Sequence, residues 1–346
     1  MYYKDWLNEW LETCVKPMRK SSTYDLYCRL TRGLIIPELG GYHLEELSAR
    51  VLQNFANGLI ARLAPNTVSN ILNIVKCSLK RAHVLGITET RNTDRIQTPK
   101  AKEKEVECFS RAEQRKMEMY IMAKGGAKLF GVQLCLYTGL RIGELLALEW
   151  SDLDLRRGRI SVYKTCRDSW KNGKYEKLFD TPKTPSSVRV IPLPKQFLAV
   201  ARVFKKKSKS GFVVCDKKGN GVTVRSYQKA FERLQKKLGI PHRGFHSLRH
   251  TFATRAIECG IDAKALSEIM GHENPMLTLK RYTHALMPHK EAMMNKLGKV
   301  FAEMGAEFFK GLTLEQEYNL YLDFVKTSKE QNAELGGSGK NYPENR

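Results

Sequence analysis

Four short segments of the chain carry side chains that suit chemistry on a phosphodiester. They are Thr138-Gly-Leu-Arg-Ile-Gly-Glu144, Thr181-Pro-Lys-Thr184, His246-Ser-Leu-Arg-His250, and Gly271-His272 with Tyr282 ten residues later. Attack on a phosphodiester raises the charge on its oxygens from one negative charge towards two. Guanidinium groups suit that charge, because they are always protonated and present forked donors. Arg141 and Arg249 are therefore the candidate phosphate clamp.

The other members of this set can supply the remaining groups of such a reaction. His246 and His272 can donate hydrogen bonds or move protons near neutral pH. The phenolic oxygen of Tyr282, with an ordinary pKa of about 10, can act as the nucleophile once a base lies near it. Lys183 is the candidate acid for the leaving oxygen. Preorganised donors of this kind contribute on the order of 3 kcal/mol each to lowering the barrier.

Each residue taken singly also has an ordinary structural interpretation. An arginine at a helix start is usually a surface residue, and His246 with Arg249 could be a simple polar pair on one helix face. Tyr282 is one of 14 tyrosines. The combination of types and order, however, fits one reaction.

The charge of the chain indicates a polyanionic partner. Its 346 residues carry a net charge of +23, and 42% of them are hydrophobic, enough for folded cores. The charge is uneven, because the segment from Phe301 onward has five basic and eight acidic residues, a net −3, which leaves +26 on residues 1–300. We expect the body to meet phosphates and the tail to meet protein.

The cysteines and the hydropathy pattern exclude several classes. The 8 cysteines form no CxxC pair, which argues against a zinc knuckle or a redox motif. Neither a signal peptide nor a membrane-spanning run is visible, so we expect a cytoplasmic protein with reduced thiols and no membrane partner. We expect no metal and no cofactor.

The first hundred residues have helical patterns, notably Asp5–Val15 and Asn66–Leu85. The second of these places Lys76, Lys80 and Arg81 on its polar face. That face is either simply solvated or lies along a DNA groove, and the sequence leaves both open.

We expect a mainly α-helical chain with a small antiparallel β-sheet. The predicted parts are a helical DNA-binding domain (1–97), a polar linker (98–107), a second domain (108–300) and a tail (301–346). In the second domain, Ser110 and Glu113 predict a helix start, followed by an apolar helix, Leu129–Tyr137. The runs Arg159–Tyr163 and Val188–Leu193 are β-type, the stretch between them is polar, and the pattern is helical again from Ser226 onward. Within the polar stretch, Lys171 and Lys174 are further candidate DNA contacts.

The tail carries an amphipathic helix pattern of its own. Thr313 and Gln316 predict a capping box, and an apolar stripe follows. One isolated helix cannot bury such a stripe by itself, so it must dock on this protomer or on a neighbour.

The residues in their order resemble the tyrosine recombinase, or phage integrase, family. The motifs TGLRIGELLAL, TPKTPSSVRVIPL, HSLRHTFAT and IMGHENPMLTLKRYTH are similar to its boxes, over roughly Phe109 to Leu297. The resemblance implies a helical core-binding domain joined to a catalytic domain. It also assigns supporting positions to Glu144, which orients the pocket, and to His250.

The resemblance further implies a mechanism. Tyr282 attacks the scissile phosphate of a double-stranded core or attachment site and forms a 3′-phosphotyrosine, without metal or ATP. Arg141, Arg249 and His272 hold the phosphate, Lys183 protonates the leaving 5′ oxygen, and His246 assists proton transfer. Exchange proceeds through a Holliday junction in a homo-tetramer linked by the tail helices. An accessory DNA-bending or excisionase protein is a further expected partner.

Several alternatives stay open at this level. The chain could resolve chromosome dimers rather than integrate and excise a mobile element, or relax DNA as a type IB topoisomerase does. A metal-dependent hydrolase using His242, His246 and His250 is disfavoured by Pro241 and Gly244, which make a helix through His242 doubtful. A non-catalytic DNA-binding relative is disfavoured because every catalytic residue type is present. Integrases often carry an extra N-terminal arm-binding domain, and the sequence does not decide whether one has been removed.

Overall fold

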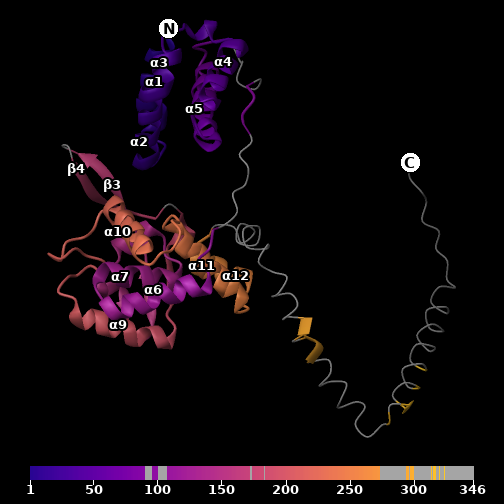
Figure 1. Cartoon of the computed structure of the whole chain (residues 1–346). Coiled ribbons are helices and arrows are strands. Elements are labelled where there is room, and N and C mark those ends of the chain that lie inside the picture. Colours follow the sequence, from indigo (N-terminus) through magenta and orange to yellow (C-terminus); the bar gives the residue numbers. More distant parts are fainter. Residues whose placement is uncertain are drawn as a thin grey trace. The chain divides into compact units, whose positions relative to one another are not determined.

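The computed structural model describes residues 1–89, 96–99, 107–171, 174–182 and 184–272, with a few separate positions between 294 and 323. The chain divides into two compact units, Met1–Glu105 and Val106–Arg346 (Figure 1). Helices dominate and the strands form small antiparallel sheets, as the sequence predicts. Within the described ranges, no helix is both long and apolar enough to cross a bilayer.

In its described residues, the N-terminal unit is built mainly from helices. They are α1 (Tyr3–Trp10), α2 (Ser21–Leu30), α3 (Ile36–Leu39), α4 (Ala49–Ile60) and α5 (Pro65–Val84). A π-helical turn, Leu11–Val15, prolongs α1, so the helix expected over Asp5–Val15 is confirmed with a wider final turn. The helix expected over Asn66–Leu85 is confirmed as α5.

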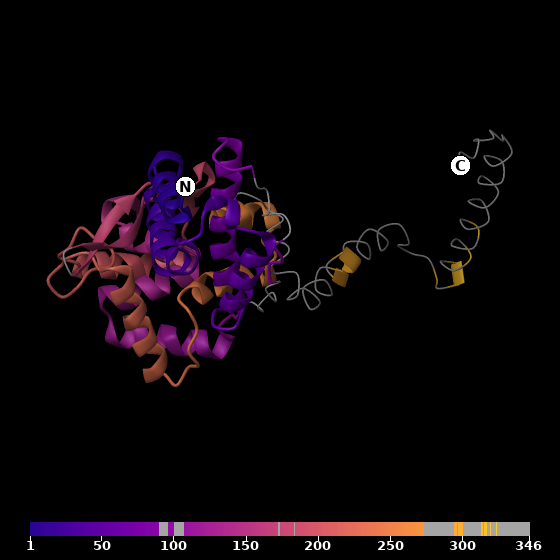
Figure 2. The same cartoon turned by 90° about the horizontal axis from the view of Figure 1, so that it is seen from above.

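Aromatic side chains join α1 to α5. Tyr3 and Trp6 are fully buried among the apolar stripe of α5. The Tyr3 hydroxyl lies 2.7 Å from the Ser78 Oγ, and the Trp6 Nε1 donates to the Ser78 carbonyl at 3.0 Å. Figure 2 shows the indigo N-terminal helices beside the purple helices of residues 49–84. Complete burial of one large apolar side chain contributes about 2 kcal/mol, so this seam holds the unit together.

The second unit places most of its helices around a buried central helix, α7 (Ala127–Thr138). Its other described α-helices are α6 (Arg111–Lys124), α8 (Ile142–Ala147), α9 (Lys195–Lys207), α10 (Val224–Lys237), α11 (His246–Glu258) and α12 (Ala263–Met270). Reciprocal bonds between Ser110 and Glu113, of 2.8 and 3.1 Å, confirm the predicted capping box of α6. Helix α7 is buried along most of its length and contacts α6, α9, α10 and α11.

The two predicted β-type runs form one antiparallel sheet. Its order is β1 (Leu153–Asp154), β2 (Arg159–Val162) and β5 (Arg189–Pro192). Ile160 pairs with Ile191, and both side chains are buried against the helices. This sheet places the start of β5 beside α12, with which it is in contact.

The polar stretch between these runs contains a hairpin that the sequence pattern does not predict. Its strands are β3 (Thr165–Lys171) and β4 (Lys174–Asp180), paired antiparallel. Asp168 accepts hydrogen bonds from the backbone N–H groups of Val224 and Arg225, at 2.7 and 2.8 Å, and so caps α10. Lys177 donates to the Leu146 carbonyl at 2.5 Å. Charged side chains therefore anchor the middle of this hairpin, where Asp168 and Lys177 pair. For this reason the strands lack the alternation of apolar residues by which a strand is recognised in a sequence.

Candidate active site

The first candidate arginine lies where α7 ends and α8 begins. Gly139 closes α7 in the left-handed conformation, with φ of 63°, and a Cβ there would approach the Phe252 ring to 2.5 Å. Arg141 then forms the N-cap of α8, and its backbone N–H donates to the Glu144 carboxylate at 2.9 Å. One helix therefore ends at Gly139, and the next begins directly after Arg141.

The Arg141 side chain joins this helix start to the end of α12. Its Nη1 donates to the Glu144 Oε1 at 2.7 Å, and its Nη2 donates to the Gly271 carbonyl at 2.8 Å. The side chain is 36% exposed, so its guanidinium is both fixed and accessible. A fixed, accessible guanidinium is what a clamp for a phosphate oxygen requires.

Arg249 reaches the same region from α11. It is 2% exposed, and it donates to the carbonyls of Gly139 at 2.8 Å and Met270 at 2.7 Å. Both carbonyls lie at helix C-terminal ends, where the partial charge is negative and favours a cation. The structure therefore brings Arg141 and Arg249 together at the C-terminal end of α12.

His272 follows directly after this helix end. Gly271 closes α12 with φ of 63°, and a Cβ there would meet the Arg189 guanidinium at 3.0 Å and the Ser186 carbonyl at 3.1 Å. The His272 N–H donates to the Ser267 carbonyl at 3.0 Å, and the side chain is half-buried. A tight glycine turn thus places His272 directly after Met270 and Gly271, the two residues whose carbonyls bind Arg249 and Arg141.

His246 is the first residue of α11 and is exposed, one turn before Arg249. Its ring packs edge-on against the His250 ring, with centroids 4.6 Å apart. Because the helix starts at His246, His242 lies off it, and the three histidines do not share a helix face. Within the described part of the chain, no group of three His, Cys, Asp or Glu side chains is placed to hold a metal.

Arg189, at the start of β5, belongs to this cluster and was not singled out from the sequence. Its side chain is 6% exposed and forms a bidentate pair with the Glu144 carboxylate, at 2.9 and 3.1 Å. Its Nε donates to the Ile269 carbonyl at 2.6 Å. The motif text around Lys183 includes this arginine, but only the fold shows that its partner is Glu144.

Glu144 is the buried anion of the site, with an exposed side-chain fraction of 3%. Burial is the largest influence on its pKa and would raise it. The hydrogen bond and charge of Arg189, with the charge of Arg141, outweigh burial and hold the pKa of Glu144 below its ordinary value. The carboxylate therefore stays ionised between two guanidiniums, in agreement with an orienting role.

The remaining predicted site residues fall in different places. Lys183 and Tyr282 lie outside the described residues, as do the side chains of Lys171 and Lys174 at the ends of β3 and β4. The predicted DNA contacts of α5 divide into two kinds. Lys76 is half-buried and donates to the Ile96 carbonyl at 3.1 Å, whereas Lys80 and Arg81 are exposed.

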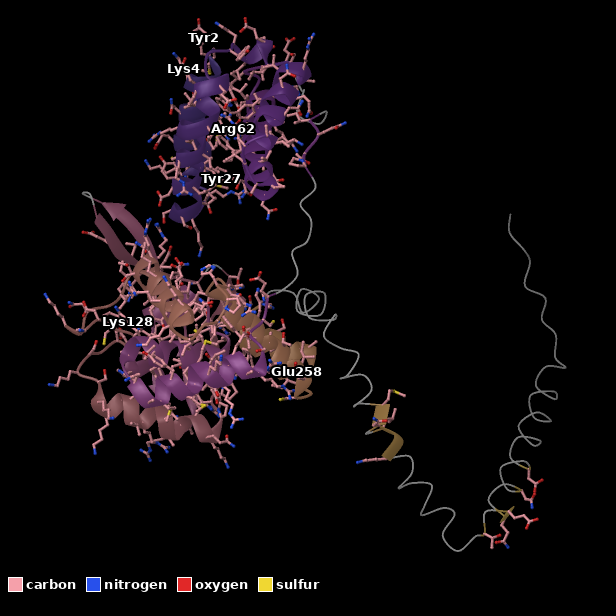
Figure 3. The ribbon with its side chains drawn as sticks, viewed as in Figure 1. Tyr2, Lys4, Tyr27, Arg62, Lys128 and Glu258 are labelled. Carbon is pink, nitrogen blue, oxygen red and sulfur yellow. The ribbon has the colours of Figure 1, made fainter. Side chains whose placement is uncertain are left out.

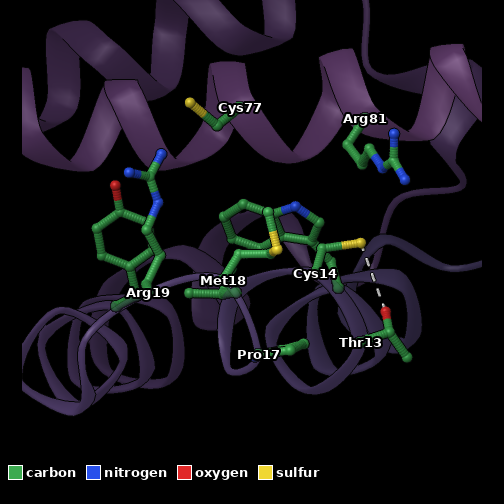
Figure 4. Close-up of a pocket in the computed structure, with 10 residues that line it drawn as sticks. Thr13, Cys14, Pro17, Met18, Arg19, Cys77 and Arg81 are labelled. Carbon is green, nitrogen blue, oxygen red and sulfur yellow. Dashed lines mark hydrogen bonds between the residues drawn. The ribbon is translucent and has the colours of Figure 1, made fainter.

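A cavity of about 690 Å³ in the N-terminal unit has Arg81 at its edge (Figure 4). Trp10 and Tyr27 line it and stack with ring centroids 6.0 Å apart. Arg19, from the segment after the π-helical turn, lines it together with Arg81. Figure 3 shows how many nitrogen-bearing side chains this unit presents, among them Lys4 and Arg62. The two arginines of this cavity suit the phosphates of a nucleic-acid backbone.

Guanidiniums held at one helix end, next to a histidine, are groups whose chemistry suits a phosphate. The family comparisons agree with this geometry. The N-terminal SAM-like domain of phage integrases matches residues 2–60, and the phage integrase family matches residues 102–289. Because the second match covers more than half of the chain, this protein belongs to the phage integrase family of tyrosine recombinases.

The individual relatives are XerC-like tyrosine recombinases and the transposases or integrases of transposons. A tyrosine recombinase XerC-like protein of Caldanaerobacter subterraneus subsp. tengcongensis is 27% identical over 86% of this chain and 83% of its own length. The transposase of transposon Tn916 from Enterococcus faecalis is 34% identical over 49% of this chain and 45% of its own. The Tn1549 transposon integrase, solved with transposon right end DNA, superimposes with a TM-score of 0.73 at 25% identity, over 86% of this chain and 100% of that one.

Proposed function

We propose that this chain is a site-specific DNA recombinase that cuts and rejoins double-stranded DNA at core sites of a mobile element. The observation that supports this most directly is the meeting of Arg141 and Arg249 at the end of α12, next to His272. The likeness to the Tn916 transposase and to the Tn1549 integrase favours a mobile element as the substrate. The net charge of +23 suits a DNA partner.

In the proposed cleavage step, the phenolic oxygen of Tyr282 attacks the scissile phosphorus. The bond from phosphorus to the 5′ oxygen breaks, and Lys183 gives that oxygen a proton. Arg141, Arg249 and His272 bind the phosphoryl oxygens while their charge grows, and His246 takes part in proton transfer at the tyrosine. The 3′-phosphotyrosine conserves the energy of the bond, so that rejoining needs neither ATP nor a metal.

We propose further that four copies act together, exchange strands through a Holliday junction and dock their tail helices in trans. Reciprocal bonds between Thr313 and Gln316, at 2.8 and 3.3 Å, support a helix start at the predicted place. Removal of residues 313–346 should then preserve binding of a single site but abolish strand exchange. An accessory DNA-bending or excisionase protein would set the direction of the reaction.

Chromosome-dimer resolution is the second candidate, because the XerC-like relative matches 86% of the chain. The two functions differ in the site that is used. Recombination between the ends of an excised element would support the first function, and recombination only at a replication-terminus site would support the second.

A nicked DNA substrate that traps the covalent intermediate tests the proposal. The wild-type chain should form a covalent complex that survives denaturation and EDTA, whereas Tyr282→Phe should bind the DNA equally well and form none. An undiminished adduct in Tyr282→Phe would refute the nucleophile. Lys183→Ala should cleave slowly, and a 5′-thiol leaving group, which needs no acid, should restore its rate.

A further inference from the structure

Three arginines meet three successive carbonyl groups at the end of α12. Arg189 donates to Ile269 at 2.6 Å, Arg249 to Met270 at 2.7 Å, and Arg141 to Gly271 at 2.8 Å. The last carbonyls of a helix have no partner within the helix. Here each of them takes a guanidinium from a different element, β5, α11 or the start of α8. This arrangement, the α12 clamp, ties the three residues that precede His272 to those three elements, one arginine to each residue.

Arg189 differs from the other two arginines of the α12 clamp. Its side chain is 6% exposed and also holds Glu144 through two hydrogen bonds. The Glu144 carboxylate in turn accepts from the side chain and the backbone N–H of Arg141. The planar fork of an arginine can serve a carboxylate and a carbonyl together, which a lysine ammonium cannot do with the same geometry.

We propose that Arg189 is a positioning residue for the cleavage step, a role that rests on the proposed function. It acts through Glu144 on Arg141 and through the Ile269 carbonyl on the end of α12, which leads to His272. Without Arg189, the Glu144 carboxylate has Arg141 as its main counter-ion and draws that guanidinium away from the phosphate. The Ile269 carbonyl also loses its donor, so the helix end is held less firmly.

The effect should be seen in the rate of chemistry rather than in DNA binding. Displacement of a catalytic group by about 1 Å costs on the order of 10²-fold in rate. At saturating nicked DNA, Arg189→Gln should therefore form the covalent complex on the order of 10²-fold more slowly than wild type, and Arg189→Lys nearly as slowly. Arg255→Gln is the matched control, because Arg255 also binds a carboxylate, Glu258 at 2.7 Å, and a carbonyl, Phe109 at 3.0 Å. Its rate should stay close to that of wild type.

A neutral scissile group separates positioning from simple loss of structure. A methylphosphonate replaces one charged oxygen by a methyl group, so the transition state needs less positive charge from Arg141. Arg141→Ala and Arg189→Gln should both lose less rate on methylphosphonate DNA than on ordinary DNA. Because part of the Arg189 effect passes through Arg141, Arg189→Gln should slow the Arg141→Ala variant by a smaller factor than it slows the wild-type chain. If Arg189 had a merely structural role, Arg189→Gln would slow the reaction by the same factor on both kinds of DNA. Its effect on free energy would then add to that of Arg141→Ala in the double variant.

Several results would overturn the proposal. One such result is that Arg189→Gln and Arg189→Lys form the covalent complex as fast as Arg255→Gln. Another is that Arg189→Gln slows the reaction by the same factor on methylphosphonate DNA as on ordinary DNA. If Arg189→Gln does not fold, Arg189→Lys gives the same comparison, and a folded Arg189→Lys with full rate would also contradict it. Absence of any covalent complex with the wild-type chain would instead disprove the proposed function.

Discussion

The N-terminal unit and the catalytic unit place their charges differently. Among the described residues of the N-terminal unit, the buried polar side chains are Thr31, Ser78 and Thr88, all uncharged. The catalytic unit buries Glu144, Asp152 and Arg249. A surface that grips a polyanion gains from solvated, adjustable cations. A site that stabilises a transition state gains from charges that are already fixed in place. This difference agrees with the proposal that the N-terminal unit grips DNA and that the catalytic unit, Val106–Arg346, carries out the reaction.

The buried charges should also make the catalytic unit more sensitive to substitution. Loss of one partner from a buried ion pair typically costs about 3–5 kcal/mol, whereas an exposed pair contributes about 0–1 kcal/mol. Four substitutions test this contrast between the units, given in the order of their expected effect.

Arg249→Ala should have the largest effect. Covalent complex formation should fall by about 10²–10³-fold, because a fixed guanidinium at the phosphate is lost. The carbonyls of Gly139 and Met270 would lose their donors as well. Single-turnover cleavage of nicked DNA measures the rate, and anisotropy of labelled DNA should show binding within a few-fold of wild type. Equal losses in binding and cleavage would break the contrast between the units.

Glu144→Gln should lower the free energy of unfolding by about 3 kcal/mol at neutral pH. Since the pKa of Glu144 is held below 4.5, its stabilisation is complete above pH 4.5 and is lost as pH falls through the lowered value. The difference in free energy of unfolding between wild type and Glu144→Gln should therefore become smaller at acidic pH. Denaturant unfolding at several pH values measures it.

Glu258→Gln serves as the control for that measurement. Glu258 lies at the C-terminal end of α11 (Figure 3), pairs with Arg111 and Arg255, and is 28% exposed. Its substitution should destabilise the protein less than that of Glu144. If Glu258→Gln lowered the free energy of unfolding more than Glu144→Gln, burial would not determine the size of the effect.

Tyr3→Phe should destabilise the N-terminal unit by about 1 kcal/mol, because one buried hydrogen bond to Ser78 is lost. Hydrogen exchange of α1 and α5 should report the change. Cleavage at saturating DNA should be unaffected, and a slowed reaction would contradict the division of labour between the units.

Arg81→Ala should have the smallest effect on energy. One phosphate contact should be lost, so DNA affinity falls a few-fold and the slope of affinity against salt decreases by about one. Arg62→Ala is the control, since Arg62 is already paired with Glu38. Titrations at several salt concentrations would show an unchanged slope for Arg81→Ala if α5 does not meet the backbone.

Local signals in the sequence predict much of this architecture. The glycine at 139, the capping boxes at Ser110 and Thr313, and the alternating runs around Ile160 and Ile191 each act over a few residues, and the structure agrees with them. Arg141 and Arg249 could also be named, because their residue type is nearly sufficient for phosphate chemistry.

Other features were not predicted, and some of them depend on contacts between distant segments. The hairpin of β3 and β4 is held by Asp168 on α10 and by Lys177 against α8, so its polar residues do not alternate with apolar ones. The Asn172-Gly173 dipeptide between its strands is a typical hairpin signal that the polar pattern outweighed. Helix α9 was not predicted either, although Phe197 and Ala201 form its buried face. Arg189 meets Glu144 across 45 positions of sequence.

The glycine turn at the end of α12 has a consequence for mutation at this position. Every amino-acid substitution at Gly271 adds a Cβ that meets Arg189 and the Ser186 carbonyl, in a backbone conformation that L residues rarely adopt. A base change that replaces this glycine therefore strains the turn that leads to His272.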